Sequence, residues 1–407
     1  MPVSAMLAFL LVCAWAWLQS VPLSSLPFDL TGLAHPGWAR LERIGLDGAP
    51  LIGLNAIDTR DALMRLLTCG AAFWLASRLA IDRERAKFMA FALIAIASFY
   101  ALYGLANHLL GLAWILPGVP RPSMARLQST FVNANNFATF ANMALFTALA
   151  FVTAPLFARD SAPGSWLKQA ASGLASPKGT FLGAAIVILA FASLLTGSRG
   201  GLLSLALTLA FLSFLIALAA RIPLFWRIAV PSVLVVLFSG VMLVSGDYSL
   251  SRIGRAAGLG DARLAMYDTT LQMIADRPWL GHGYGNFEAA FMAYRDERLS
   301  AVVDKAHNTY LEHAAELGLP ATLLLYAAIA ILLVRIQHGF FTRRRDRAFT
   351  LAAWLAAMVA GLHALVDFSL QIPAVGYTFT VLLGIGIAQS TSSHVHVELE
   401  PKESHAR

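Results

Sequence analysis

Charged residues are scarce in this sequence, and their scarcity indicates its class. Of the 407 residues only 13% are Asp, Glu, Lys or Arg, whereas 58% are hydrophobic. Soluble globular domains are about 25% charged. Apolar runs of about 20 residues, the length that crosses a bilayer as a helix, recur along the whole chain. The composition therefore predicts an all-α, polytopic membrane protein.

Cysteine is nearly absent too. Cys13 and Cys69 both lie in apolar runs, and neither their spacing nor their setting suggests a disulfide framework or a metal site. The sequence also lacks a Walker A loop, a Gly-x-Gly-x-x-Gly turn, a His-Glu-x-x-His helix and a Cys-x-x-Cys pair. No Asp-rich cluster suits a magnesium diphosphate. We therefore expect no metal and no cofactor, and a phosphate leaving group would have to be stabilised by arginines.

The formal charge of +7 does not indicate nucleic acid, because most basic residues flank apolar runs, as the positive-inside rule expects. About ten spans are predicted. They cover residues 4–20, 61–80, 87–109, 135–157, 180–196, 200–220, 226–245, 319–337, 348–366 and 373–389. No internal repeat is visible, which argues against an inverted-repeat transporter.

Orientation follows from the basic residues of the short loops. If the N-terminus is cytoplasmic, one set of loops is rich in Arg and Lys, and the opposite short loops hold only Arg121, Arg126 and Arg199. The basic set comprises Arg78, Arg83, Arg85, Lys87, Arg159, Lys168, Lys178, Arg221, Arg227, Arg335, Arg343, Arg344, Arg345 and Arg347. We therefore expect both termini in the cytoplasm and a disordered tail over 391–407.

The predicted organisation has four parts. Residues 1–245 hold seven spans and two outer segments, 21–60 and 110–134, the first without an assigned role. Residues 246–318 form a large outer loop, 319–390 hold three spans, and 391–407 are the tail. Within the loop we expect three short helices, from apolar spacing and turn residues. The first carries Leu264, Tyr267, Leu271 and Ile274 with Asp261 as its N-cap, the second carries Phe287, Phe291 and Tyr294, and His307 opens the third.

An arginine stands in the tight turn at residues 196–201, between two apolar spans. The planar guanidinium of Arg199 suits bidentate contact with phosphate, and Ser198 and the flanking glycines let backbone N–H groups approach an anion. The alternative is an arginine that extends to water from a glycine-rich turn.

Other polar residues precede spans or lie on the loop. Arg263 falls in the first predicted loop helix beside Tyr267, where it either binds an anion or is simply solvated. Arg121 and Arg126 precede three asparagines at the mouth of a span, Asn133, Asn135 and Asn136. Asparagines there can cap the helix, or bind sugar hydroxyls and phosphate.

His307 is a candidate general base, because an imidazole with its ordinary pKa near 6.5 accepts a proton at neutral pH. The alternative is a structural histidine. His313, six positions on, lies about 120° round a helix, so a zinc pair is not expected. His363 and Asp367 are four apart at the outer end of a span, and either pair with each other or line the site.

Together these pieces resemble the O-antigen ligase and polymerase superfamily of bacterial inner-membrane glycosyltransferases. The resemblance spans about residues 120–390. The matching stretches are residues 129–137 (STFVNANNF), 195–201 (LTGSRGG), 278–287 (PWLGHGYGNF) with Arg263, 306–312 (AHNTYLE) and 363–373.

The resemblance implies a GT-C-like membrane fold and transfer of a glycan from undecaprenyl diphosphate on the periplasmic side, without metal or nucleotide sugar. It implies that Arg199 and Arg263, with Arg126, hold the diphosphate, and that His307 takes the proton of the acceptor hydroxyl. Substrate contacts are expected from Arg121, Asn133, Asn135, Asn136, Ser198, Tyr267, Asn308, His363 and Asp367.

Several functions remain open within and beyond this class. Lipid A-core as acceptor defines a ligase, which is the first choice; a second lipid-linked repeat defines a polymerase, and a protein hydroxyl an O-oligosaccharyltransferase. A transporter or flippase for the same lipid-linked glycan would need ionisable residues along a midplane path. A non-catalytic scaffold would not need His307 or the arginines.

Overall fold

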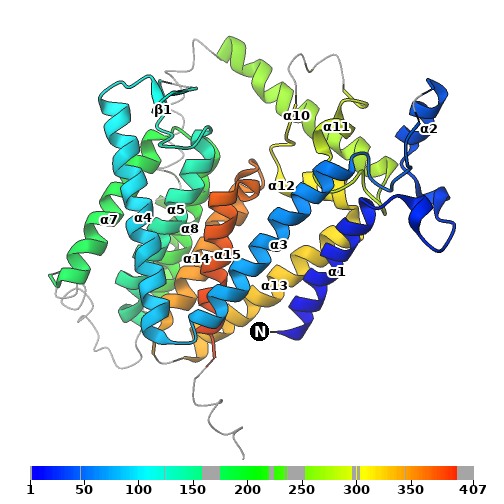
Figure 1. Ribbon diagram of the computed structural model, residues 1–407. Helices are drawn as coiled ribbons and strands as arrows, with labels where there is room; N and C mark the ends of the chain where they lie inside the picture. Colours follow the sequence, from blue (N-terminus) through cyan, green and yellow to red (C-terminus); the bar gives the residue numbers. More distant parts are fainter. Residues whose placement is uncertain are drawn as a thin grey trace, which may run out of the picture.

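The structure is a computed structural model that describes residues 2–45, 47–122, 124–157, 175–219, 224–233, 236, 253–295, 299, 303–343 and 345–391, without the side chains of 253–262. The described chain is almost wholly helical, with one small antiparallel hairpin of β1 (Trp114–Leu116) and β2 (Val119–Pro120) (Figure 1). The predicted all-α class is confirmed.

Two buried helices form the centre of the bundle. They are α5 (Ala134–Thr153) and α14 (Arg347–His363), which pack on each other along their length. Alanines recur on α14, and Ala353, Ala356 and Ala360 are fully buried. Small side chains let helix backbones approach closely, which is how membrane helices gain packing energy. The outer ends of α5 and α14 therefore meet at a fixed distance.

The remaining long helices flank this pair on two sides (Figure 1). On one side lie α4 (Arg83–Leu109), α7 (Pro177–Leu195) and α8 (Arg199–Ala219). On the other lie α1 (Val3–Gln19), α3 (Ala56–Leu79), α13 (Leu319–Thr342) and α15 (Pro373–Ala388). The helix α15 lies between α14 and α3 and contacts both.

Six described helices are long and apolar enough to cross a membrane: α3, α4, the run Ala134–Phe157 that extends α5 through η3 (Ala154–Phe157), α7, α8 and α13. Shorter apolar helices are α1, Leu224–Val233, α14 and α15. Nine predicted spans overlap described apolar helices. The seventh overlaps Leu224–Val233 only in part, because its residues 234–235 and 237–245 lie outside the described residues. The count of ten crossings stays a prediction.

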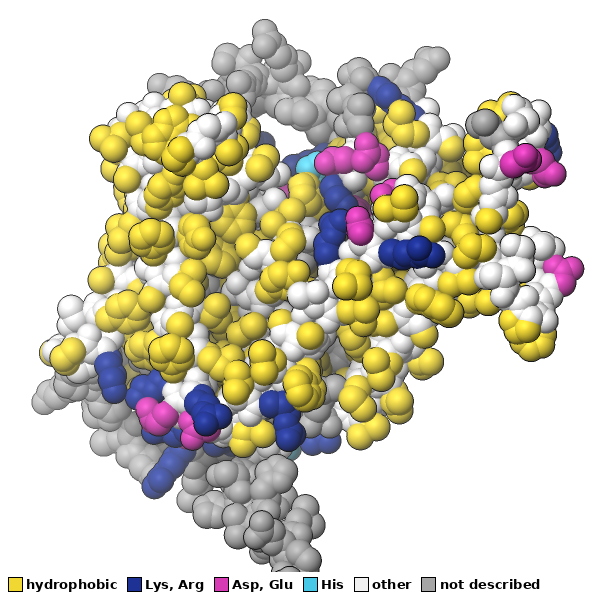
Figure 2. All heavy atoms as spheres, in the orientation of Figure 1, with side chains coloured by type: hydrophobic (Ala, Val, Ile, Leu, Met, Phe, Trp, Pro, Cys, Tyr) yellow, Lys and Arg dark blue, Asp and Glu magenta, His cyan; other side chains and the backbone are white. Residues whose placement is uncertain are grey.

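The charged loops gather at opposite ends of the bundle. At one end Arg83 and Asp346 form an ion pair of 2.7 Å, and Gln389 donates to the carbonyl of Ala80. At the other end the backbone N–H of Thr309 donates to the carbonyl of Ala364. Figure 2 shows a broad hydrophobic band between a basic group at the lower edge and a second charged group above. Which end faces the cytoplasm stays a prediction.

A helical cap lies over the second end and consists of α10 (Ile253–Asp276), α11 (Phe287–Phe291) and α12 (Thr309–Leu317). Met273, Phe287 and Phe291 form its buried core. Asp261 is not an N-cap as predicted, because α10 begins eight residues earlier and Asp261 lies within it. The residues before Asp261 are already helical, so its side chain does not stand at the start of the helix.

The outer segment 21–60, which had no assigned role, fastens the cap to the bundle. The segment carries η1 (Leu23–Ser25), η2 (Thr31–Leu33) and α2 (Pro36–Arg43), and it leads into α3. The side-chain oxygen of Asn286 accepts hydrogen bonds from the backbone of Leu54 and Asn55. Gln19, at the end of α1, donates to the carbonyls of Leu280 and Glu316. The first 60 residues therefore help to position α11 and α12.

A buried histidine pair joins this segment to the cap. Nε2 of His35 lies 2.9 Å from Nδ1 of His282, and Nε2 of His282 lies 3.0 Å from the carbonyl of Met273. A carbonyl can only accept, so Nε2 of His282 holds a proton and its Nδ1 accepts from His35. Nδ1 of His35 accepts from the backbone of Gly37. Both rings are neutral and every ring nitrogen is satisfied.

This pair predicts acid sensitivity of the cap. Burial lowers the pKa of His35 from 6.5 to about 3 and also lowers that of His282. When segment 21–60 is detached from the cap, both histidines bind protons below about pH 6.5, whereas the packed pair does not. The equilibrium constant for packing therefore falls as the pH falls, by up to about tenfold per histidine per pH unit. We expect the Tm of the purified protein to fall between pH 7.5 and pH 5.0.

The control is the double variant His35→Gln, His282→Gln, which should lose this pH dependence. His338→Gln, at the far end of α13, should keep it. An unchanged pH dependence in the double variant would contradict the assignment.

Candidate active site

A buried carboxylate, Asp367, connects the elements at the outer end of the bundle. It follows α14 and is fully inaccessible to solvent. Its two oxygens accept hydrogen bonds from Asn135 at 2.8 Å and from Ser369 at 2.5 Å. Its own carbonyl accepts from the hydroxyl of Thr309 at 2.9 Å. One residue thus joins α5, the turn before α15 and the start of α12.

Arg126 reaches the same network from the segment before α5. Its Nη2 donates to Asn135 at 2.7 Å, and its Nε donates to the carbonyl of Thr196 at 2.7 Å. Burial lowers the pKa of Arg126, while the charge of Asp367 acts in the opposite direction. The guanidinium remains cationic, because arginine is not deprotonated in proteins. A fixed positive charge therefore stands beside the 196–201 turn.

The three predicted asparagines have distinct roles in this region. Asn133 is the N-cap of α5 and accepts from the backbone of Asn135. Asn135 links Arg126 to Asp367, and the side-chain oxygen of Asn136 lies 3.1 Å from the hydroxyl of Ser369. One asparagine therefore caps the helix, and the side chains of Asn135 and Asn136 hold the first turn of α5 in place.

The segment with His307 is attached to this network by the next residues. The N–H of Thr309 donates to Ala364, and the hydroxyl of Tyr310 donates to Gly361 at 2.9 Å. Asn308 is the N-cap of α12 and accepts from two backbone N–H groups. The third cap helix therefore begins at Thr309, two residues after His307.

His307 itself has an unusual backbone conformation. Its φ is +51°, in the left-handed region that costs a non-glycine residue about 1 kcal/mol or more. Such strain persists only where surrounding contacts hold it. The hydroxyl of Tyr267 donates to the carbonyl of His307 at 3.1 Å, and the ring of His307 packs edge-on against Phe368. Its Nδ1 is buried and has no hydrogen-bond partner among the described residues.

A buried acid on α12 holds the other side of this segment. Glu312 is fully buried, and its oxygens accept from Lys305 at 3.0 Å and from the backbone of Ala306 at 2.9 Å. Burial opposes the charge of Lys305, but the carboxylates of Glu312 and Glu316 outweigh it and raise the pKa of Lys305. Glu312 thus clamps the two residues before His307.

The electrostatics leave His307 neutral and the arginines charged. Burial lowers the pKa of His307; Asp367 raises it and Arg263 lowers it further. The charge of Arg263 also lowers the pKa of Arg126, so both arginines act on one small region. Burial raises the pKa of Tyr267 beside them. The region therefore combines an uncharged imidazole with fixed positive charge, which suits a base next to an anionic leaving group.

The 196–201 turn lies against the same region. A Cβ built on Gly200 would stand 3.0 Å from Nε2 of His363, and one on Gly197 would stand 3.8 Å from Nε of Arg126. Ser198 is buried and accepts from the backbone of Gly201. Arg199, the first residue of α8, is exposed and has no hydrogen bond or ion pair among the described residues. Its guanidinium is therefore available to an anion.

His363 and Asp367 do not hydrogen-bond to each other, which removes one of the two predicted arrangements. Nδ1 of His363 lies 2.5 Å from the hydroxyl of Thr139 on α5, while Asp367 takes Asn135 and Ser369. Arg121 lies at the margin and donates to His108 and to the carbonyl of Arg126. Asn135 and the 196–201 turn meet the end of α14 at Asp367 and His363. The roles of all the predicted site residues in substrate binding stay predictions.

Sequence reasoning missed the residues that support His307. Glu312 stood in the quoted motif without a role, and Lys305, Thr309 and Ser369 were not singled out. A signal existed in the spacing of Glu312 and Glu316, four apart on a short helix otherwise rich in alanine and leucine, since acids on such a face need partners.

One comparison with known proteins bears directly on this arrangement. A family model described as O-antigen ligase matches residues 184–326, from α7 into α13. Residues 184–326 are therefore similar to the O-antigen ligase domain. The matched stretch contains Arg199, Arg263 and His307, whereas Arg126 and Asp367 lie outside it. No curated protein matches the chain.

The O-antigen ligase domain and the apolar helices agree with a multi-pass membrane protein of the ligase or polymerase type. Among the described residues no group of three or more His, Cys, Asp and Glu could hold a metal ion. Independence from metal stays a prediction that needs an activity measurement.

The charge of Asp367 predicts a shift in the pH profile of glycan transfer. Because this charge raises the pKa of His307, Asp367→Asn should lower it further. A base works only when neutral, so the acidic limb of transfer should move to lower pH, whatever the loss in maximal rate. Transfer rates between pH 4.5 and 8 would measure this limb.

Asp346→Asn, at the opposite end of the bundle, is the matched control and should leave the limb in place. A limb that stays fixed in Asp367→Asn, or moves to higher pH, would contradict the electrostatic link to His307.

Proposed function

We propose that this protein is an O-antigen ligase-type enzyme that moves a glycan from undecaprenyl diphosphate to an acceptor hydroxyl, with lipid A-core as the acceptor. One observation carries the proposal: a neutral, strained His307 lies at one end of a membrane bundle, where the charges of Arg263 and Asp367 act both on it and on Arg126. Residues of the O-antigen ligase domain supply His307 and Arg263.

The reaction assigns a separate role to each group. The acceptor oxygen attacks the anomeric carbon of the donor sugar from the face opposite the diphosphate. The bond between that carbon and the diphosphate oxygen breaks, and its electron pair stays on the diphosphate. His307 takes the hydroxyl proton, and the imidazolium then releases it to water. General-base catalysis of this kind contributes about 10²- to 10⁴-fold.

Arg126, Arg199 and Arg263 offset the charge that develops on the leaving diphosphate. Charges fixed in advance stabilise a transition state without reorganisation during the reaction, which is often the largest catalytic contribution. Arg126 is fixed by Asn135 and Thr196, while Arg199 is exposed and available. Arg126 is thus preorganised, and the arginines together replace the metal that other diphosphate-dependent enzymes use. The helices α5, α7 and α8 form the groove for the polyprenyl tail.

The membrane setting follows from the positive-inside rule. The ion pair of Arg83 with Asp346 marks the basic end, and His307 lies at the other. We assign the basic end and both termini to the cytoplasm and the site to the periplasmic face of the bacterial inner membrane. The gathering of His307, Arg126 and Arg263 at one end supports interfacial chemistry over a transporter, which would need such groups along a midplane path.

A transfer assay tests the proposal. Purified protein in nanodiscs receives undecaprenyl-diphosphate glycan, lipid A-core and excess EDTA, and products are measured by mass. We expect transfer by wild type to survive EDTA, and His307→Ala and Arg199→Ala each to lose about 100-fold or more. The matched controls His338→Ala and Arg335→Ala, on α13 towards the basic end, should retain full transfer.

Each other result redirects the assignment. Equal transfer by wild type and His307→Ala would contradict the general-base role. Loss of wild-type transfer in EDTA would contradict the metal-free mechanism. Extension of the donor glycan without transfer to lipid A-core would identify a polymerase, and transfer only to a protein hydroxyl would identify an O-oligosaccharyltransferase.

A further inference from the structure

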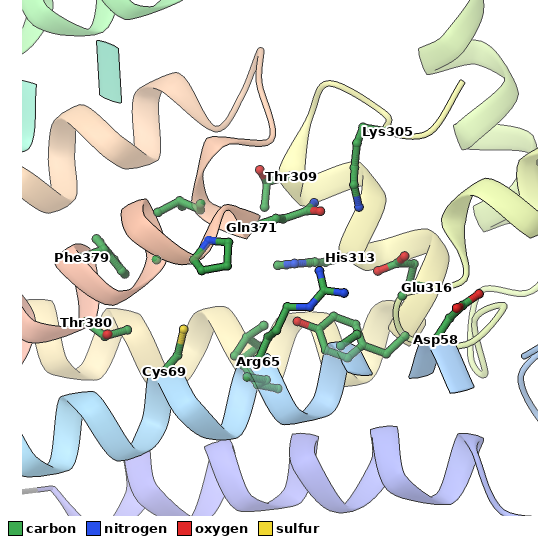
Figure 3. Close-up of a pocket in the computed structure, with 18 of the residues that line it drawn as sticks. Asp58, Arg65, Cys69, Lys305, Thr309, His313, Glu316, Gln371, Phe379 and Thr380 are labelled. Atoms are coloured by element: carbon green, nitrogen blue, oxygen red, sulfur yellow. The ribbon is translucent and has the colours of Figure 1, made fainter. Parts of the chain in front are cut away.

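A cavity between α3, α12, α13 and α15 carries charges of both signs. Its volume is about 540 Å³, and Figure 3 shows the cations Arg65 and Lys305 among the carboxylates of Asp58 and Glu316. Glu288 adds a third carboxylate to the lining. This cavity therefore favours neither an anionic nor a cationic ligand.

A smaller cavity at the basic end of the bundle has a more uniform charge. Its volume is about 280 Å³, and it lies between the first turns of α4 and α14 and the end of α5 with η3. The rings of Phe151 and Phe349, which meet edge-on with centroids 5.3 Å apart, form part of its apolar wall. Its charged lining residues are Arg83, Lys87, Asp346 and Arg347.

The two carboxylates of this region are already paired. Asp346 lies 2.7 Å from Nε of Arg83 and 4.0 Å from Nη2 of Arg343. Glu84 lies 3.2 Å from Nη1 of Arg83 and 3.8 Å from Nζ of Lys87. Lys178 interacts with Lys87 in turn, so this cluster has four cations against two carboxylates and an excess of two positive charges.

Two of these cations stand against each other. The side chain of Lys87 on α4 lies within hydrogen-bonding reach of the side chain of Lys178, in the first turn of α7. An ammonium group has three donors and no acceptor, so the two groups repel each other and cannot form a hydrogen bond. Glu84 is exposed, and an exposed ion pair offsets little of this repulsion. An anion between the lysines would accept a hydrogen bond from each.

The first turn of α14 adds backbone donors to the cavity. Arg347, Ala348 and Phe349 line it and begin this helix. Asp346 is the N-cap, but its carboxylate makes no capping hydrogen bond and instead pairs with Arg83. The first N–H groups of a helix have no partner within the helix, and its dipole is positive at that end, so both favour an anion there.

The surface beside the cavity identifies a lipid as the source of the anion. Phe88, next to Lys87 on the apolar helix α4, is 75% exposed, and Ile81 before this helix is also exposed. In Figure 2 the charged side chains at the lower edge border the hydrophobic band of the bundle. Basic pockets between the ends of membrane helices suit anionic lipid head groups.

We propose that this cavity holds the phosphate of an anionic phospholipid between Arg83, Lys87 and Lys178, with the acyl chains along the exposed face of α4 at Phe88. The bound lipid then links the ends of α4, α7 and α14. The inference goes beyond the proposed function and does not depend on it, because no step of glycan transfer involves this end of the bundle.

A lipid titration tests the site. The purified full chain in dodecyl maltoside micelles receives dioleoyl phosphatidylglycerol, dioleoyl phosphatidylcholine or inorganic phosphate, and the Tm is measured at each concentration by tryptophan fluorescence. We expect phosphatidylglycerol to raise the Tm in a saturable manner and to bind about tenfold or more tightly than phosphatidylcholine. Inorganic phosphate at the same concentration should leave the Tm unchanged, because it has no apolar part.

Substitution of the two lysines separates the site from a general effect of lipid. Lys87→Gln with Lys178→Gln should weaken phosphatidylglycerol binding about 30-fold, since each basic residue near an anionic head group contributes about fivefold. Without lipid this variant should be at least as stable as wild type, because the repulsion is removed. Lys87→Arg with Lys178→Arg keeps both charges and should retain most of the affinity. Arg78→Gln, exposed at the same end of the bundle, is the matched control and should bind as wild type does.

Each other outcome overturns the inference. Equal stabilisation by phosphatidylcholine would remove the role of the anionic head group, and equal stabilisation by inorganic phosphate would make the cavity a site for a free anion. Unchanged affinity in the double glutamine variant would place the lipid elsewhere, and lower stability of that variant without lipid would contradict the like-charge contact. An equal loss in Arg78→Gln would indicate a diffuse effect of basic charge.

Discussion

The outer end of this bundle depends on one buried anion, the carboxylate of Asp367. A charge removed from water costs several kcal/mol unless hydrogen bonds and opposite charges compensate it. Asn135 and Ser369 supply the hydrogen bonds, and Arg126 lies one side chain away through Asn135. The backbone carbonyl of Asp367 also accepts a hydrogen bond from Thr309. The residue that needs these hydrogen bonds to be buried therefore also holds the segment that carries His307.

The bundle and the cap make different contributions at His307: the bundle supplies close helix packing, and the cap supplies the contacts that hold the strained backbone. The alanine-rich α14 packs closely on α5, so the network of Asp367 stands on a rigid pair. The cap supplies Tyr267 and the Glu312 clamp, which hold His307 at a positive φ. Backbone strain of this kind persists where surrounding contacts over-determine it, and it concentrates at functional positions. The strain is consistent with a residue held for chemistry rather than for packing.

The N-terminal segment gives the cap its position over the bundle. Contacts from Gln19, His35 and Asn55 reach residues 280–286, more than 200 positions away in the sequence. They tie the turn after α10 to α1 and to the start of α3. The fold therefore uses the first 60 residues to hold the cap that carries Tyr267 and Glu312 over the bundle.

The sequence by itself determined the membrane class, the positions of the apolar helices and the short stretches with Arg199, Arg263 and His307, because composition and helical periodicity act over a few neighbouring residues. It placed the start of α10 wrongly, since a capping residue such as Asp261 does not end a helix whose backbone hydrogen bonds continue past it. Only the tertiary structure decided the partners of Asp367, the clamp of Glu312 and the pairing of His35 with His282. Those contacts join residues up to 247 positions apart, and their geometry depends on how whole helices pack.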